Sequence, residues 1–139
     1  MLEITYPMLP PSLNSSYATN FKTGKRFPSK ELTFIKKNFV KLAKFEVYGQ
    51  NTIYPLNEFC KEIEGKKLCL VIILNMRHDQ LYTKKGTIKK FDCSNRIKAI
   101  EDCICKFLEI DDSVIFRVAV EKRLTTTEIN TVCSLMVHR

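Results

Sequence analysis

The stretch FDCSNRIKAIEDCICKFLEIDDSVI, residues 91–115, brings acidic side chains close to a lysine. Its polar residues that could take part in catalysis or metal binding are Asp92, Asn95, Lys98, Asp102, Asp111 and Asp112. Carboxylate oxygens are ligands that Mg²⁺ prefers. The whole chain has a formal net charge of +8, which would hold phosphates near such a metal. This combination predicts a metal-dependent nuclease.

A helix must position most of these residues. At about 100° per residue, Asn95, Lys98 and Asp102 fall on one stripe about 60° wide. The opposite side is apolar, with Ile97, Ile100, Ile104, Phe107 and Leu108. We expect the helix to follow Asp92, with Ser94 as its N-cap, and to end near Glu109. Asp111 and Asp112 then form a turn into a strand, Val114–Val120. The sequence alone leaves open whether Asp92 and Asp112 meet.

Each of these residues also has an ordinary structural explanation. Asp92 and Ser94 are favoured as helix caps, and the pair Asp111-Asp112 is typical of a plain turn. Asn95, Lys98 and Asp102 would suit the solvated face of an amphipathic helix. For any single residue the structural explanation is the more common one. The whole set, together with the resemblance described below, favours a catalytic site.

The remaining sequence predicts one α+β domain spanning residues 1–139, because 139 residues are too few for two well-buried cores. We expect a small mixed β-sheet packed with two main helices. The expected elements are a strand Leu2–Tyr6, a loop Pro10–Pro28, a helix capped by Ser29 from Lys30 to about Tyr48, a short helix within residues 50–67, a central strand Leu68–Met76, and an antiparallel hairpin of Val114–Lys122 with Thr131–His138.

No segment has the roughly 18 uninterrupted apolar residues of a membrane span, and the N-terminus lacks a signal-peptide pattern. We therefore expect a cytoplasmic protein. Its six cysteines contain no C-x-x-C pair. Free thiols in a reducing compartment fit this better than zinc or disulfides.

Positive charge is concentrated between Arg77 and Lys98, with seven Lys or Arg against two Asp. Lys84, Lys85, Lys89 and Lys90 are expected on a mobile loop that contacts phosphates. Lys22, Lys25 and Arg26 form a second basic loop, and Tyr82 could stack on an unpaired base. The alternative is a soluble, lysine-rich surface. A sequence pI of about 9.2 favours nucleic acid as the partner.

The pattern Asp92-Cys93-Ser94-Asn95, Lys98, Asp102 and Asp111-Asp112-Ser113-Val114 resembles the RusA family of Holliday-junction resolvases. The segment Pro10–Tyr17 resembles the family's opening motif, a proline-rich turn followed by Asn and an aromatic residue. Gly24-Lys25-Arg26 and Ser29 follow in a loop before a helix, as in the family. The resemblance covers nearly the whole chain, and its second part is the more specific.

This resemblance implies a structure-selective endodeoxyribonuclease that resolves four-way DNA in recombination and repair. Asp92 and Asp112 match the metal-binding aspartates, with Asp111 beside them, and Lys98 matches the essential lysine. Ser94, Asn95 and Asp102 match supporting positions. The implied cofactor is Mg²⁺, with Mn²⁺ as a substitute. DNA contacts are expected from Asn14, Tyr17, Lys22, Lys25, Arg26, Lys84, Lys85, Lys89, Lys90 and Arg96.

The resemblance also implies a homodimer, because a four-way junction has near two-fold symmetry and needs paired cuts. Apolar candidates for the dimer surface are Phe34, Phe45 and Phe59. The Lys-, Ile- and Asn-rich composition suggests an AT-rich genome, such as that of a prophage.

One position departs from the family pattern, because Ser94 stands where the family has a second aspartate. A hydroxyl is a weaker Mg²⁺ ligand than a carboxylate. The second hypothesis is therefore a branched-DNA-binding protein of the same fold with weakened catalysis. The third is a nucleic-acid-binding module unrelated to junctions, in which the acidic residues are purely structural.

Overall fold

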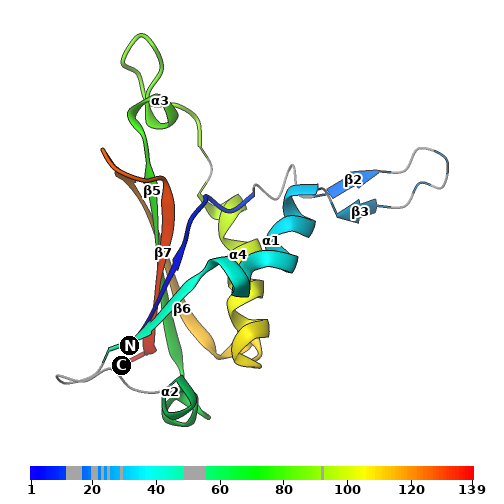
Figure 1. Cartoon of the computed structure of the whole chain (residues 1–139), viewed down its shortest axis with the longest axis vertical. Helices are drawn as coiled ribbons and strands as arrows, with labels where there is room; N and C mark the ends of the chain where they lie inside the picture. Colours follow the sequence, from blue (N-terminus) through cyan, green and yellow to red (C-terminus); the bar gives the residue numbers. More distant parts are fainter. Residues whose placement is uncertain are drawn as a thin grey trace.

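A five-stranded mixed sheet carries the two main helices on one face (Figure 1). The structure is a computed structural model. It describes residues 1–11, 17–19, 22, 24, 26–28, 30–48, 56–91 and 93–139, and of residues 17–19, 26–28, 94 and 95 it describes only the backbone.

The sheet has the strand order β4-β1-β7-β5-β6. Its strands are β1 (Leu2–Tyr6), β4 (Lys44–Val47), β5 (Leu68–Met76), β6 (Ile115–Leu124) and β7 (Asn130–Val137). Only β5 and β6 are parallel neighbours in this sheet, and the other pairs are antiparallel. A parallel pair needs a crossover connection, and here helix α4 provides it. The predicted α+β architecture with a mixed sheet is confirmed.

The described residues form further elements outside this sheet. They are α1 (Lys30–Leu42), α2 (Leu56–Ile63), the short α3 (His78–Leu81), α4 (Ser94–Leu108), a 3₁₀ turn η2 (Asp112–Val114), and a two-stranded pair of β2 (Tyr17–Thr19) with β3 (Arg26–Pro28). None of the described helices has the length and apolar character needed to cross a membrane.

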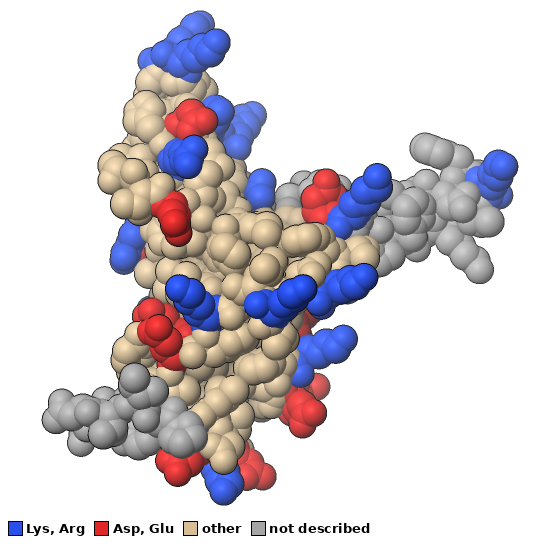
Figure 2. All heavy atoms as spheres, viewed as in Figure 1, with Lys and Arg blue, Asp and Glu red and all other residues tan. Residues whose placement is uncertain are grey.

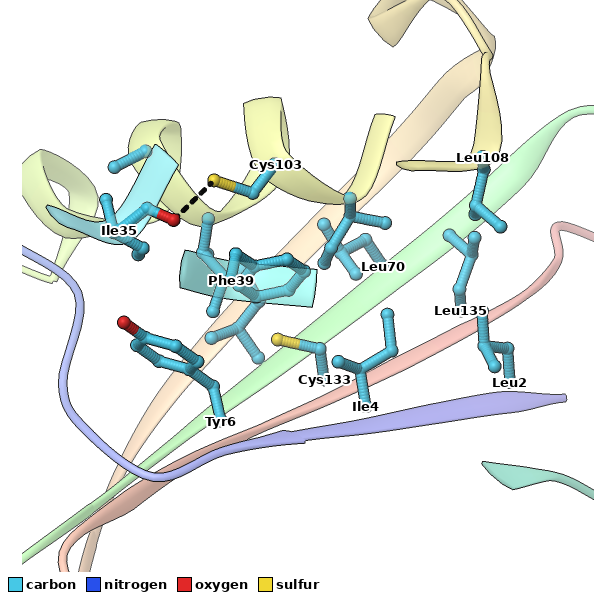
Figure 3. Packing of buried hydrophobic residues seen from close by; sticks show 14 of the residues in the cluster. Leu2, Ile4, Tyr6, Ile35, Phe39, Leu70, Cys103, Leu108, Cys133 and Leu135 are labelled. Carbon is cyan, nitrogen blue, oxygen red and sulfur yellow. Dashed lines mark hydrogen bonds between the residues drawn. The ribbon is translucent and has the colours of Figure 1, made fainter. Parts of the chain in front are cut away.

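The core lies between the sheet and helices α1 and α4 (Figure 3). From the sheet, Leu2, Ile4, Leu70 and Leu135 point toward the helices and are fully buried. Phe39 of α1 meets them, as do further residues from α4. Burial of this kind contributes roughly 25 cal/mol per Å² of apolar surface, so the core fixes how α4 lies on the sheet. That placement matters because α4 carries the candidate site.

The first main helix is shorter than predicted. It was expected to reach about Tyr48 but ends at Leu42, and Lys44–Val47 forms the edge strand β4. In β4 the exposed Lys44 and Glu46 alternate with Phe45 and Val47, which are turned toward the core. That two-residue period suits a strand. Pairing with β1 also satisfies the backbone groups of β4 that face that strand.

The predicted hairpin of the last two strands is wrong. β6 and β7 do not pair, because β5 lies between them and pairs with both. β5 is the most apolar segment of the chain and buries six of its nine residues. A strand of this kind is most stable with a neighbour on each side. The expectation that β5 is an interior strand is confirmed.

Two smaller expectations also need correction. The predicted loop Pro10–Pro28 contains the paired strands β2 and β3. Helix α4 begins at Ser94 itself, with Cys93 as its N-cap residue. Cys93 already has helical backbone angles of −62° and −42°, so Ser94 lies in the first turn and is not the cap. The helix end near Glu109 and the short helix within residues 50–67 are confirmed.

All six cysteines are free thiols, as expected. Cys103 and Cys105 are both buried. Figure 3 shows the Cys103 thiol pointing at the main chain of α1, where Sγ donates to the carbonyl oxygen of Ile35 over 3.9 Å.

Candidate active site

Lys98 lies between two aspartates. Its Nζ is 3.1 Å from Oδ1 of Asp102 and 3.0 Å from Oδ2 of Asp112. The three side chains are half exposed, with relative exposures of 45%, 45% and 49%. Hydrogen bonds to Asp112 and then Asp102 raise the pKa of Lys98 above its ordinary value. Lys98 is therefore a fixed cation at neutral pH.

Two local features of α4 build this arrangement. Lys98 and Asp102 are four residues apart, so they lie one above the other on the same helix face. At the other end, Glu109 adopts a left-handed conformation with φ of 55°, which ends the helix and reverses the chain. The reversal returns Asp112 to Lys98, fourteen residues earlier in the chain.

Asp111 has a different setting from Asp112. Its Oδ1 accepts a hydrogen bond from the backbone N–H of Ser113 over 2.9 Å and thereby caps the 3₁₀ turn η2. Hydrogen bonds from Ser113 lower the pKa of Asp111. One of its oxygens is thus used to hold the turn that presents Asp112.

Glu101 belongs to the same neighbourhood and was missed by the sequence reasoning. It is half buried, and desolvation is the largest cause that raises its pKa. Lys98 opposes that shift, while Asp112 and Asp102 add to it. The signal was present in the sequence, because Glu101 follows Lys98 by three residues and so shares its helix face.

Arg96 is held by protein groups near the start of α4. Its guanidinium donates from Nη1 to the carbonyl oxygen of Pro10 over 2.9 Å and lies 4.2 Å from the ring centroid of Phe91. Lys122 of β6 approaches the same ring at 5.9 Å. Partial burial lowers the pKa of Arg96. Arg96 therefore ties the N-terminal segment and the residue before Asp92 to α4.

Several predicted site residues lie outside the part of the chain that can be described. Asp92, Asn14 and Lys25 are outside the described residues, and so are the side chains of Tyr17, Arg26, Ser94 and Asn95. Among the described residues, no three carboxylate, imidazole or thiol groups lie close enough together to hold a metal ion.

The predicted phosphate-binding lysines lie on a projection that we call the finger, residues 77–90. It extends beyond the end of β5, away from the sheet (Figure 1). Lys84, Lys85, Lys89 and Lys90 are all exposed on it. Figure 2 shows Lys and Arg side chains gathered at its outer end. Lys22, from the second basic loop, is also exposed.

Comparison with protein-family models decides the affiliation. The model described as Endodeoxyribonuclease RusA matches residues 36–132, more than half of the chain. The chain belongs to the RusA family. The matched range runs from α1 into β7 and contains the finger, α4 and the turn that carries Asp112. The RusA family is a family of nucleases. No curated protein matches it at significant similarity.

Proposed function

We propose that this protein is a metal-dependent endodeoxyribonuclease that resolves four-way DNA junctions in recombination or repair. The observation that supports it best is Lys98 held between Asp102 and Asp112, on the helix that directly follows Asp92 in the chain. This lysine and both aspartates lie within the range matched by the RusA family model.

Asp92 and Asp112 are the residues that would hold Mg²⁺ or Mn²⁺, with Asp111 beside them. Their donors suit the ion, because hard divalent cations prefer carboxylate oxygens. Asp112 is half exposed and can be reached by an ion from solution. When bound, the metal would polarise the scissile phosphate and lower the pKa of an attacking water.

Lys98 supplies a second positive charge at the reacting phosphate. Its raised pKa keeps it protonated, so it stabilises charge that develops on the phosphoryl oxygens and does not act as a base. Asp102 holds the ammonium group in place from one helical turn away. Ser94 and Asn95 are assigned as supporting residues of the same helix.

The exposed lysines of the finger would hold DNA mainly through phosphate contacts, and such contacts position the protein without reading the base sequence. The residues assigned to these contacts are Asn14, Tyr17, Lys22, Lys25, Arg26, Lys84, Lys85, Lys89 and Lys90. Arg96 also remains in this set, although its guanidinium already contacts Pro10 and Phe91.

A homodimer with two sites suits the near two-fold symmetry of the junction. Of the three apolar candidates, Phe59 is buried in the core. Phe45 is stacked on Phe107, with ring centroids 4.3 Å apart. Phe34 is exposed on α1 and remains the candidate for a subunit contact.

The alternative is a branched-DNA-binding protein of the same fold with weakened catalysis. Ser94 supports it, because a neutral hydroxyl occupies the position of a family aspartate. Substitution of Ser94 by Asp separates the two functions. It should strengthen cutting if the missing charge is what limits catalysis.

The deciding experiment compares cleavage of a mobile four-way junction with that of a matched linear duplex, in Mg²⁺ or Mn²⁺ and in EDTA. Wild type should nick the junction symmetrically, and only with metal. Asp92→Asn and Asp112→Asn should abolish cutting but leave junction binding largely intact. Tight junction binding without any cutting would favour the alternative. If the protein neither cuts the junction nor binds it in preference to the duplex, both functions are refuted.

A further inference from the structure

The finger presents one exposed apolar side chain among its lysines. Ile88 is 75% exposed, more than any other large hydrophobic residue among those described. It stands between the exposed Thr87 and Lys89. A single exposed apolar residue is normal on a protein surface, so its local structure and its surroundings must decide whether it has a role.

The backbone around Ile88 is firmly held. Ile88 forms an isolated antiparallel bridge with Tyr82. On one side of it, the N–H of Thr83 donates to the carbonyl oxygen of Thr87 over 2.8 Å, and on the other side the N–H of Lys89 donates to that of Leu81 over 2.8 Å. The predicted loop is therefore a built hairpin.

The tip of this hairpin is also stabilised. The hydroxyls of Thr83 and Thr87 lie 2.6 Å apart, and the N–H of Gly86 donates to the carbonyl oxygen of Thr83 over 2.9 Å. Gly86 has φ of 82°, which a residue with a side chain would adopt only with strain. Ile88 is thus presented on a defined backbone, and its β-branched side chain has few rotamers to lose on binding.

The charge around Ile88 fits a polyanion. The finger contains five Lys or Arg residues and one acidic residue, Asp79. These cations would bind DNA phosphates, and the hairpin would then place Ile88 next to the stacked bases. Apolar side chains delivered to DNA in this way insert between base steps and unstack them.

Tyr82 is less suited to this task than the sequence suggested. It is half buried, and its ring lies against His78 with centroids 4.8 Å apart. The aromatic ring supports the finger from within, while Ile88 is the side chain that faces outward.

We propose that Ile88 is a wedge that inserts into DNA where base stacking is interrupted, and that it contributes to selectivity for branched over linear DNA. This rests on the proposed junction-directed function. Unstacking costs a few kcal/mol in an intact duplex. At a branch point part of that cost is already met, so the wedge favours the junction.

The test uses the full chain, a four-way junction with 2-aminopurine at the branch point, and a linear duplex with the same label, both in EDTA to prevent cutting. Wild type should raise the 2-aminopurine fluorescence of the junction more than that of the duplex. Ile88→Ala should remove most of this rise and weaken junction binding about tenfold, with duplex binding unchanged.

Two controls separate a wedge from other effects. Val40→Ala truncates another exposed β-branched residue, on α1. It should leave the fluorescence rise and the junction affinity unchanged. The double substitution Lys84→Ala with Lys85→Ala should weaken junction and duplex binding alike and reduce the salt dependence. Thermal melting of Ile88→Ala should match wild type, because the side chain is exposed.

The outcomes also separate this inference from the proposed function. If wild type prefers the junction but Ile88→Ala keeps the full fluorescence rise and preference, the wedge is wrong and the junction function stands. Equal loss of junction and duplex binding in Ile88→Ala would also overturn it. If wild type shows neither junction preference nor a fluorescence rise, both proposals fail.

Discussion

Lys98 of α4 and Asp112 of η2 form an ion pair of 3.0 Å between groups that are fourteen residues apart in the chain. The 15-residue helix that contains Lys98 ends at Leu108, before the chain reaches Asp112. The pair therefore exists only because the chain reverses at Glu109. It links the helix and the turn that together carry the candidate site.

Removal of the Lys98 charge should impair cleavage far more than DNA binding. We expect Lys98→Ala to reduce the junction-cleavage rate about 100-fold or more, with junction affinity within a few-fold of wild type. Single-turnover cleavage and a binding assay in EDTA measure the two quantities. The matched control is Lys89→Ala, which removes an exposed lysine of the finger. It should weaken junction binding and leave the single-turnover cleavage rate of bound junction near that of wild type. Normal cleavage by Lys98→Ala would remove this residue from the proposed mechanism.

The raised pKa of Lys98 predicts a specific pH dependence. Lys98 should remain protonated beyond the ordinary lysine value of about 10.4, and Asp112→Asn should lower its pKa because the largest cause is lost. An NMR titration of the Lys98 side chain checks both. The pKa of Lys98 is higher in the folded protein than in the unfolded chain. The ion pairs therefore stabilise the fold below the unfolded-state pKa, and this stabilisation is lost as the pH rises through the folded-state pKa. A half-exposed pair of this kind contributes little to stability. An unshifted titration in wild type would contradict the observed ion pairs.

Arg96 should matter for stability through its contacts with Pro10 and Phe91. We expect Arg96→Ala to lower the free energy of unfolding by about 1–2 kcal/mol. Arg96→Lys should restore it only partly, because an ammonium lacks the planar guanidinium that stacks on an aromatic ring. Urea denaturation measures both variants. The exposed Lys85→Ala should change stability by less than about 0.5 kcal/mol, and an equally small effect of Arg96→Ala would show that the contacts contribute nothing.

Glu109 offers a stabilising substitution. Its left-handed backbone, with φ of 55°, is unfavourable for a residue with a side chain and natural for glycine. Glu109→Gly should raise the free energy of unfolding by about 0.5–1 kcal/mol. Glu109→Ala is the matched control and should give no such gain, because alanine keeps the strain. Chemical denaturation compares the two, and equal stability of both variants would refute the argument.

Local patterns were sufficient for much of this protein. The amphipathic period of residues 94–108 predicted α4, its apolar face and the Lys98–Asp102 stripe, because side chains four residues apart share a helix face. The apolar run of β5 likewise predicted an interior strand. The motif around Lys98 and Asp112 led to the RusA family, and the family comparison confirmed it. These features depend on residues close together in the chain.

Other features depended on long-range pairing. The sequence could not show that β5 separates β6 from β7, or that Lys44–Val47 leaves the helical pattern to pair with β1. In both cases the pairing depends on the rest of the fold, because the other elements determine which strand edges are free and which face is buried. Local propensity is similar for either outcome.

The sequence by itself therefore determined the helix, the charges and the chemical character of the candidate site, because these follow from residue types at short spacing. Only the tertiary structure decided that Asp112 meets Lys98, that Arg96 contacts Pro10 and Phe91, and that Ile88 projects from a built hairpin. Each of these depends on a chain reversal or a strand pairing, and their energies come from groups brought together by the whole fold.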